Sequence, residues 1–201
     1  MCVGRSVQNF KDPLYYDTKL SPRGLQQARA LNKQVDAVMA SAHAPECVLV
    51  SPLSRTLHTL ELGFAGHLGD RAGPGGGPRL PVVVEPLCRE RVYHSSDIGS
   101  LRADLEAKHP SFDFSALPDG GPWWYTGGAG ELRPTEIAPE PAEVFVERVE
   151  RFRAALFARP EAAVAVVAHW GMLYALTGHD FDNCQLITKP VKSFPKELTV
   201  F

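Results

Sequence analysis

Three short segments of the sequence are almost wholly apolar, and stretches with helical spacing lie between them. These segments are ECVLV, PVVV and AAVAVV, at residues 46–50, 81–84 and 162–167. Their continuous apolar character predicts strands covered on both faces, as in parallel sheets. Apolar residues recur at helical intervals over 22–39, 52–64 and 140–158, and Ser21 and Pro22 are typical of a helix start. The alternation predicts an α/β fold with a mostly parallel sheet and helices on both faces.

The length of 201 residues predicts a single domain spanning 1–201. A stretch rich in glycine and proline at 66–81 predicts a flexible surface loop. The region 88–139 is irregular, apart from a predicted helix over 101–108, and is expected to form a lid. Within it, Trp123 and Trp124 fit capping a pocket and packing under a loop equally well. Weaker strand patterns occur at 183–188 and 197–201.

Charge and composition exclude several classes of protein. A formal net charge of −2 argues against a nucleic-acid-binding surface, which would need a basic excess. The first residues lack the apolar core of a signal peptide, and no apolar run is long enough to cross a membrane. The four cysteines show no C-x-x-C spacing, so neither a zinc site nor a disulfide framework is indicated. A cytoplasmic protein is expected, and the oligomeric state stays open.

Functional side chains follow the ends of the predicted strands. Arg55 lies just after the first, Glu90 after the second and His169 after the third. Because the carboxyl ends of parallel strands share one edge of a sheet, we expect these three side chains to converge. Guanidinium groups match phosphate oxygens, and a carboxyl group can move a proton to or from an ester oxygen. The pattern therefore indicates a site that handles phosphate groups.

Each of these residues also has an ordinary interpretation. A histidine after a strand is often structural, and Arg55 could be a solvated helix residue. Glu90 could pair with Arg89 or Arg91 on the surface. The placement of all three residues at separate strand ends favours a common site.

Four segments, in this order, resemble the histidine phosphatase superfamily, also called phosphoglycerate-mutase-like proteins: DTKLSPRGLQQARAL, SPLSRTLHT, PLCRE and VAHWG. PSFDFS and FDNCQL resemble its plant and fungal branch of small proteins, and the resemblance covers 9–187. It implies phosphomonoester hydrolysis through a phosphohistidine, acting on a small phosphorylated substrate or binding a phosphate-like anion. It implies no metal and no cofactor. By the same resemblance, Arg55, His169 and Asn9 would bind the phosphoryl group, and Glu90 would protonate the leaving oxygen.

The sequence departs from this family at the nucleophile. The family carries an Arg-His pair at the end of its first, central strand, and SVQN matches the residues that follow it, ending at Asn9. Counting back places Val3 at the histidine position and Cys2 at the arginine position. Neither residue can replace its counterpart. Nearly all of the first strand is missing too, so we expect a sheet without its usual middle strand.

Three interpretations follow from this departure. The true start could lie upstream of Met1, so that the whole protein is an active phosphatase or mutase. The chain could instead be an inactive module that binds a phosphorylated ligand or regulates another protein. It could also be a structural remnant.

The resemblance favours hydrolysis over mutase chemistry, because a mutase needs further basic residues in its pocket. The candidates Arg89, Arg91 and Arg102 are equally plausible as solvated charges. A second departure follows Asp97, where relatives often carry basic residues and this chain has Ile98 and Gly99.

Overall fold

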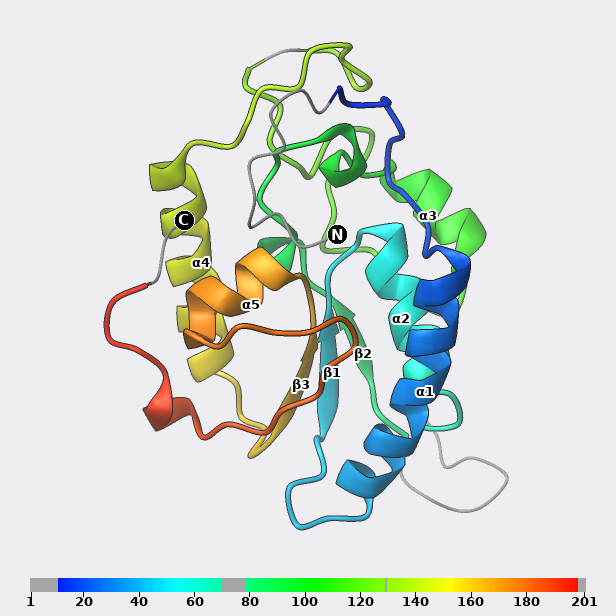
Figure 1. Ribbon diagram of the computed structural model, residues 1–201, viewed down its shortest axis with the longest axis vertical. Helices are drawn as coiled ribbons and strands as arrows, with labels where there is room; N and C mark the ends of the chain where they lie inside the picture. The colour runs from blue at the N-terminus through cyan, green and yellow to red at the C-terminus, as the bar shows by residue number, and fades with distance from the viewer. Residues whose placement is uncertain (1–10, 70–78, 129, 199–201) are drawn as a thin grey trace.

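Three parallel strands form the sheet of the computed structural model, which describes residues 11–69, 79–128 and 130–198 (Figure 1). They are β1 (Cys47–Val50), β2 (Val82–Val84) and β3 (Val164–Val167), in the order β2-β1-β3. β1 is central and pairs in parallel with both neighbours. The three predicted strands and their parallel arrangement are therefore confirmed.

Helices α1 (Pro22–Met39) and α2 (Ser54–Gly63) cover one face of the sheet. Val48 and Val50 point to this face and pack in one apolar cluster with residues of both helices and the two residues that flank α2: Leu31, Val35, Leu53, Leu57, Leu60 and Phe64. The predicted N-terminus of α1 is confirmed, since the Ser21 side chain accepts a hydrogen bond from the Gly24 N–H group. α2 begins at Ser54, two residues after the predicted start at Pro52.

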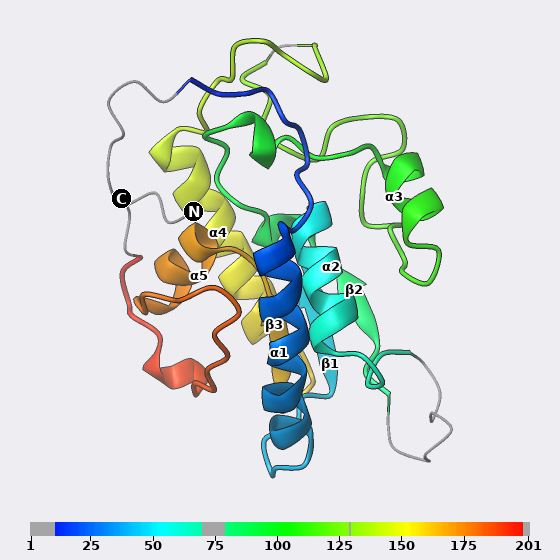
Figure 2. The same cartoon turned by 45° about the vertical axis from the view of Figure 1, so that its right-hand side comes forward.

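Helices α4 (Ala142–Phe157) and α5 (Trp170–Thr177) cover the opposite face. Leu49 alternates with Val48 and Val50 and points to this side. It packs in a second apolar cluster with Cys88, Phe145, Val149, Phe152, Met172, Ala175 and Leu176. The two views in Figures 1 and 2 show these helix pairs on opposite sides of the sheet. Helices on both faces, as predicted, leave the carboxyl ends of the strands as the place for a site.

Strand β3 differs from the prediction of a fully buried strand. Its side chains contact both apolar clusters, so both of its faces are covered. All four of its residues are nevertheless only half-buried. Among the described residues β3 pairs with β1 alone, and its other edge has no strand beside it.

The remaining elements are short. Helix α3 (Arg102–Lys108) matches the helix predicted over 101–108, and the single turns η1 (Pro86–Cys88), η2 (Ser95–Asp97) and η3 (Val191–Ser193) lie in loops. The weak strand pattern at 183–188 was wrong, and 199–201 lie outside the described residues. Most of the loop predicted at 66–81 also lies outside them, but an isolated bridge joins Leu68 to Leu80. Within the described ranges, no helix combines the length and apolar content needed to cross a bilayer.

Candidate functional site

Arg55, Glu90 and His169 line one groove of about 1900 Å³, which runs from the carboxyl ends of the strands along β3 and α1. Arg55 lies in the first turn of α2, and His169 is the residue immediately before α5. Glu90 follows the turn η1. The charge of Arg55 acts on both Glu90 and His169, so the structure brings together the three residues that the sequence placed at separate strand ends.

The His169 side chain is buried, and its Nε2 atom lies 2.8 Å from the Ser51 hydroxyl oxygen. Ser51 directly follows β1, so two adjacent strand ends supply this contact. Burial lowers the pKa of His169 well below its ordinary value, and the charges of Arg55 and Arg148 lower it further. At neutral pH the imidazole is uncharged, with one nitrogen donating and the other accepting.

Glu90 is held by two backbone N–H groups. Its Oε1 atom accepts from the Arg91 N–H group at 2.9 Å, and its Oε2 atom accepts from the Gly171 N–H group at 3.1 Å. Burial raises the pKa of Glu90, and Asp97 adds to this, although the two N–H groups and Arg55 oppose it. The Arg89 guanidinium binds Glu140, so the surface pairing of Glu90 with Arg89 is not found.

The Arg55 guanidinium is oriented by partners that the sequence did not reveal. It donates to an Asp97 carboxylate oxygen at 2.8 Å and to the Ser96 carbonyl at 2.6 Å. The second Asp97 oxygen accepts from the N–H groups of Tyr93 and His94. Asp97 is buried, whereas the Arg55 side chain is 22% exposed and borders the groove. Ser96 and Asp97 thus each hold one terminal nitrogen of the guanidinium at the groove wall.

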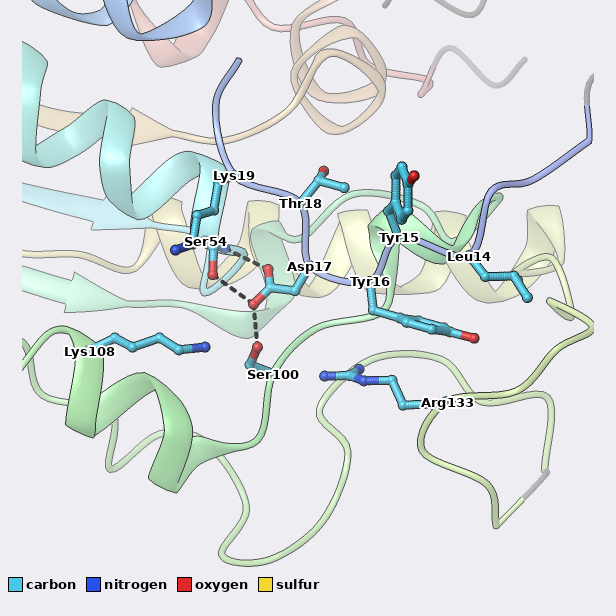
Figure 3. A pocket seen from close by; sticks show the side chains of 10 residues that line it. All are labelled: Leu14, Tyr15, Tyr16, Asp17, Thr18, Lys19, Ser54, Ser100, Lys108 and Arg133. Atoms are coloured by element: carbon cyan, nitrogen blue, oxygen red, sulfur yellow. Dashed lines mark hydrogen bonds between the residues drawn. The ribbon is translucent and has the colours of Figure 1, made fainter. Parts of the chain in front are cut away.

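Asp17 supports the start of α2 from a distant part of the sequence. One of its carboxylate oxygens accepts from the Ser54 N–H group at 2.7 Å, and the other accepts from the hydroxyls of Ser54 and Ser100 at 2.7 and 2.6 Å. Figure 3 shows these three bonds in a shallow hollow beside the groove. Since no side chain of its own caps α2, Asp17 caps the helix that carries Arg55.

Trp123 packs against the segment that follows Asp97. Its indole N–H donates to the Ser100 carbonyl at 2.8 Å, and its ring lies against Gly99. Trp123 and Trp124 are both buried in the apolar cluster that α1 and α2 cover. Of the two interpretations of this pair, packing under a loop is the one that the structure shows.

The other arginines named from the sequence have different surroundings. Arg89 is buried against Glu140, and Arg102 pairs on the surface with Glu106. Arg91 is buried and lines the groove. Asn9, Val3 and Cys2 lie outside the described residues.

The arrangement combines three chemical capabilities in one groove. A guanidinium can bind anionic oxygens, and a neutral imidazole can donate a hydrogen bond to them. A carboxyl group with a raised pKa can deliver a proton to a departing oxygen. Across the described ranges, no group of three or more histidine, cysteine, aspartate or glutamate side chains is placed to hold a metal ion.

Comparison with family models matches residues 14–185 to the histidine phosphatase superfamily (branch 1). The chain is 29% identical over 186 residues to a Schizosaccharomyces pombe protein named a probable phosphatase, covering 90% of this chain and 74% of that protein. It is 28% identical over 189 residues to an Arabidopsis thaliana phosphoglycerate mutase-like protein, covering 85% of this chain and 66% of that protein.

Among solved structures, the α-ribazole phosphatase of Shigella flexneri matches with a TM-score of 0.46 and 25% identity. The match covers 82% of this chain and 72% of that one.

Proposed function

The chain belongs to the histidine phosphatase superfamily, and on that premise we propose that its groove binds the phosphoryl group of a small phosphomonoester. The observation that carries this proposal is the convergence of Arg55, Glu90 and His169, from three separate strand ends, on one groove. The chemistry proposed for the site is phosphomonoester hydrolysis through a phosphohistidine. The match to a relative named a probable phosphatase supports hydrolysis over mutase chemistry.

Each of the three residues has a role in this proposal. Arg55 binds the phosphoryl oxygens with the N–H groups of its guanidinium that Ser96 and Asp97 do not use. His169 donates a hydrogen bond to the same oxygens as charge builds on them. The Ser51 hydroxyl, which contacts its Nε2 atom, helps to set the imidazole orientation.

With a histidine nucleophile such as the family carries, Glu90 would move the proton in both steps of the reaction. In the first, a histidine nitrogen forms a bond to phosphorus, the bond to the leaving oxygen breaks, and Glu90 gives that oxygen a proton. In the second, Glu90 takes a proton from the attacking water while the phosphorus–nitrogen bond breaks. The raised pKa of Glu90 supports the first role, because it keeps the carboxyl protonated at higher pH.

The nucleophile is the part of this chemistry that the sequence does not supply where the family has it. Val3 occupies the matching position and has no nucleophilic atom. We therefore expect the 201-residue chain to bind phosphate-like anions without turnover. This outcome corresponds to the second candidate function, a non-catalytic module for a phosphorylated ligand. Arg55 is held in a fixed orientation by Asp97, close to Glu90, and this arrangement favours such a module over a structural remnant.

Thermal unfolding with and without orthovanadate, together with hydrolysis of an aryl phosphate, tests the proposal. Vanadate at 100 times its Kd is expected to raise the melting temperature by about 5–11 °C, since it adds about 2.7 kcal/mol. The shift should disappear in Arg55→Ala and His169→Ala and persist in Arg102→Ala, which removes an exposed arginine outside the groove.

The two measurements separate the interpretations. Stabilisation without hydrolysis supports the binding module. Hydrolysis that is lost in Arg55→Ala and His169→Ala shows a working enzyme and overturns the expectation of no turnover. No vanadate shift in the unsubstituted chain contradicts the proposed site altogether.

A further inference from the structure

A cluster of buried charges lies directly behind Glu90. Glu140 is fully buried, and its two carboxylate oxygens each lie 2.8 Å from a nitrogen of Arg89. The same oxygens accept from Nε and a terminal nitrogen of Arg148, at 3.0 and 2.9 Å. Both arginines are buried as well. One carboxylate thus holds two guanidinium groups, one on the segment of Glu90 and one on helix α4.

The cluster forms hydrogen bonds to the backbone of the segment that carries Glu90. One terminal nitrogen of Arg148 donates to the carbonyls of Leu87 and Arg89, both at 2.8 Å, and the other donates to the Glu90 carbonyl at 3.4 Å. Three carbonyls in a four-residue stretch are therefore bound by a single side chain. A terminal nitrogen of Arg89 also donates to the Glu90 carbonyl, at 3.1 Å.

Glu140 ties the far side of this stretch too. Its backbone N–H group donates to the Val92 carbonyl at 2.8 Å, and its own carbonyl accepts from Arg91 Nε at 2.9 Å. Residues 87–92 are consequently fixed on both sides of Glu90. The Glu90 carboxyl then meets the Gly171 N–H group, in the first turn of α5.

Stability alone is a weak reason to bury such a cluster. Removing charges from water is costly, and apolar replacements of buried ion clusters are often as stable. Burial would raise the pKa of Glu140, yet its hydrogen bonds and ion pairs with Arg89 and Arg148 lower it to about 2. The carboxylate is therefore charged at every pH at which the site would work. A permanent anion is suited to holding two guanidinium groups in one orientation.

We propose that Glu140 is a positioning residue for Glu90, acting through Arg89 and Arg148, which fix the backbone on which the Glu90 carboxyl is presented to Gly171. The catalytic importance of positioning Glu90 rests on the proposed function, but the positioning of its carboxyl by Glu140 does not. Glu140 does not line the groove. The Glu140 side chain acts on the site through these two arginines and through the Val92 N–H group, which donates to one of its oxygens at 3.3 Å.

The amide signals of Gly171 and Arg91 provide a direct test, because both N–H groups donate to the Glu90 carboxyl. A pH titration followed by ¹H–¹⁵N correlation spectra should show both amides moving with one midpoint, above the ordinary pKa of glutamate. The same titration in Glu90→Gln identifies this transition by its loss. The charges that act on the Glu90 pKa are Arg55 from α2 and Asp97 from η2, and neither is changed in the test. Arg89 and Arg148 lie against its carbonyl, and Arg148→Lys keeps the charge there.

Glu140→Gln is expected to release the turn and give the Glu90 carboxyl access to water. The shared midpoint should then fall toward the ordinary value, and the Gly171 amide should lose most of its pH response. Glu161→Gln is the matched control, since it removes a carboxylate that binds Arg159 at the opposite end of β3. Its titration should equal that of the unsubstituted chain.

A folded Glu140→Gln protein with an unchanged Gly171 and Arg91 titration would overturn the proposal and leave Glu140 a purely structural residue. If Glu140→Gln does not fold, Arg148→Lys decides the matter, because lysine keeps the charge beside Glu140 but cannot span three carbonyls. It should show the same fall in midpoint, and an unchanged midpoint would again overturn the proposal. Failure of the unsubstituted chain to bind vanadate would contradict the proposed function without affecting this result.

Discussion

Replacing Asp17 with alanine tests how the start of α2 is held. Asp17 is buried and accepts hydrogen bonds from the Ser54 N–H group and the hydroxyls of Ser54 and Ser100. Loss of the cap on Ser54 costs about 1 kcal/mol, and each buried hydroxyl left without its acceptor costs about 1 kcal/mol more. Asp17 also has φ of 44°, a left-handed conformation that costs alanine about 1 kcal/mol. Together these effects predict a loss of about 4 kcal/mol in the free energy of unfolding.

Urea unfolding followed by circular dichroism measures this loss, provided that the slope of the transition is unchanged. Asp17→Gly removes the hydrogen bonds without the backbone strain and should cost about 1 kcal/mol less than Asp17→Ala. Asp17→Asn keeps one acceptor oxygen and tolerates the left-handed backbone, so its cost should be about half. Asp113→Ala, which removes an exposed aspartate bonded only to Ser115, should cost under about 0.5 kcal/mol. A loss of under about 1 kcal/mol in Asp17→Ala, or equal losses in the alanine and glycine variants, would refute the reasoning.

Three further predictions concern the buried groups. The pKa of Glu140 is lowered to about 2 in the folded protein, so its charged form stabilises the fold at pH values above its ordinary pKa of 4.5. This contribution, on the order of 3 kcal/mol, should be lost as the pH falls from 4.5 to 2. A free energy of unfolding that stays constant over this pH range would contradict the prediction. The lowered pKa of His169 predicts a neutral ring at pH 6, which long-range ¹H–¹⁵N spectra can detect. The free energy of unfolding should fall as the pH drops below about 6.5, the ordinary pKa of histidine. A charged ring at pH 6 would contradict this prediction. Phe152→Ala should cost about 3–5 kcal/mol in urea unfolding yet leave vanadate affinity unchanged, since Phe152 is fully buried and does not line the groove; a weakened affinity would show that the second apolar cluster shapes the site.

The regular elements could be predicted from the sequence because their signals are local. The apolar runs at β1, β2 and β3 and the helical spacing of α1 and α4 each depend on residues that are close in the chain. The exposure of β3 could not be predicted in this way. Whether an apolar strand lies inside a sheet or at its edge depends on its neighbours, and its own four residues carry no record of them.

The candidate site shows the same division. The meeting of Arg55, Glu90 and His169 follows from parallel strands, whose carboxyl ends share one edge. The groups that hold them have no local pattern, because Asp97 lies 42 residues from Arg55 and Glu140 lies 51 residues from Arg89. Such pairs form only when loops fold over the sheet. The groove residues could therefore be predicted from the sequence, but the residues that hold them in place could not.

The contact between Gly99 and Trp123 sets an order in which this protein could change through evolution. A β-carbon at position 99 would lie 2.6 Å from Cη2 of the indole, inside the volume that the ring fills. A side chain at position 99, including the basic residues that the family often carries near it, fits only if a smaller residue first replaces Trp123. That first step would create a cavity and remove the hydrogen bond to the Ser100 carbonyl, so it would be harmful on its own. Positions 99 and 123 are therefore expected to be epistatic, because every single substitution at position 99 meets this clash while Trp123 is present.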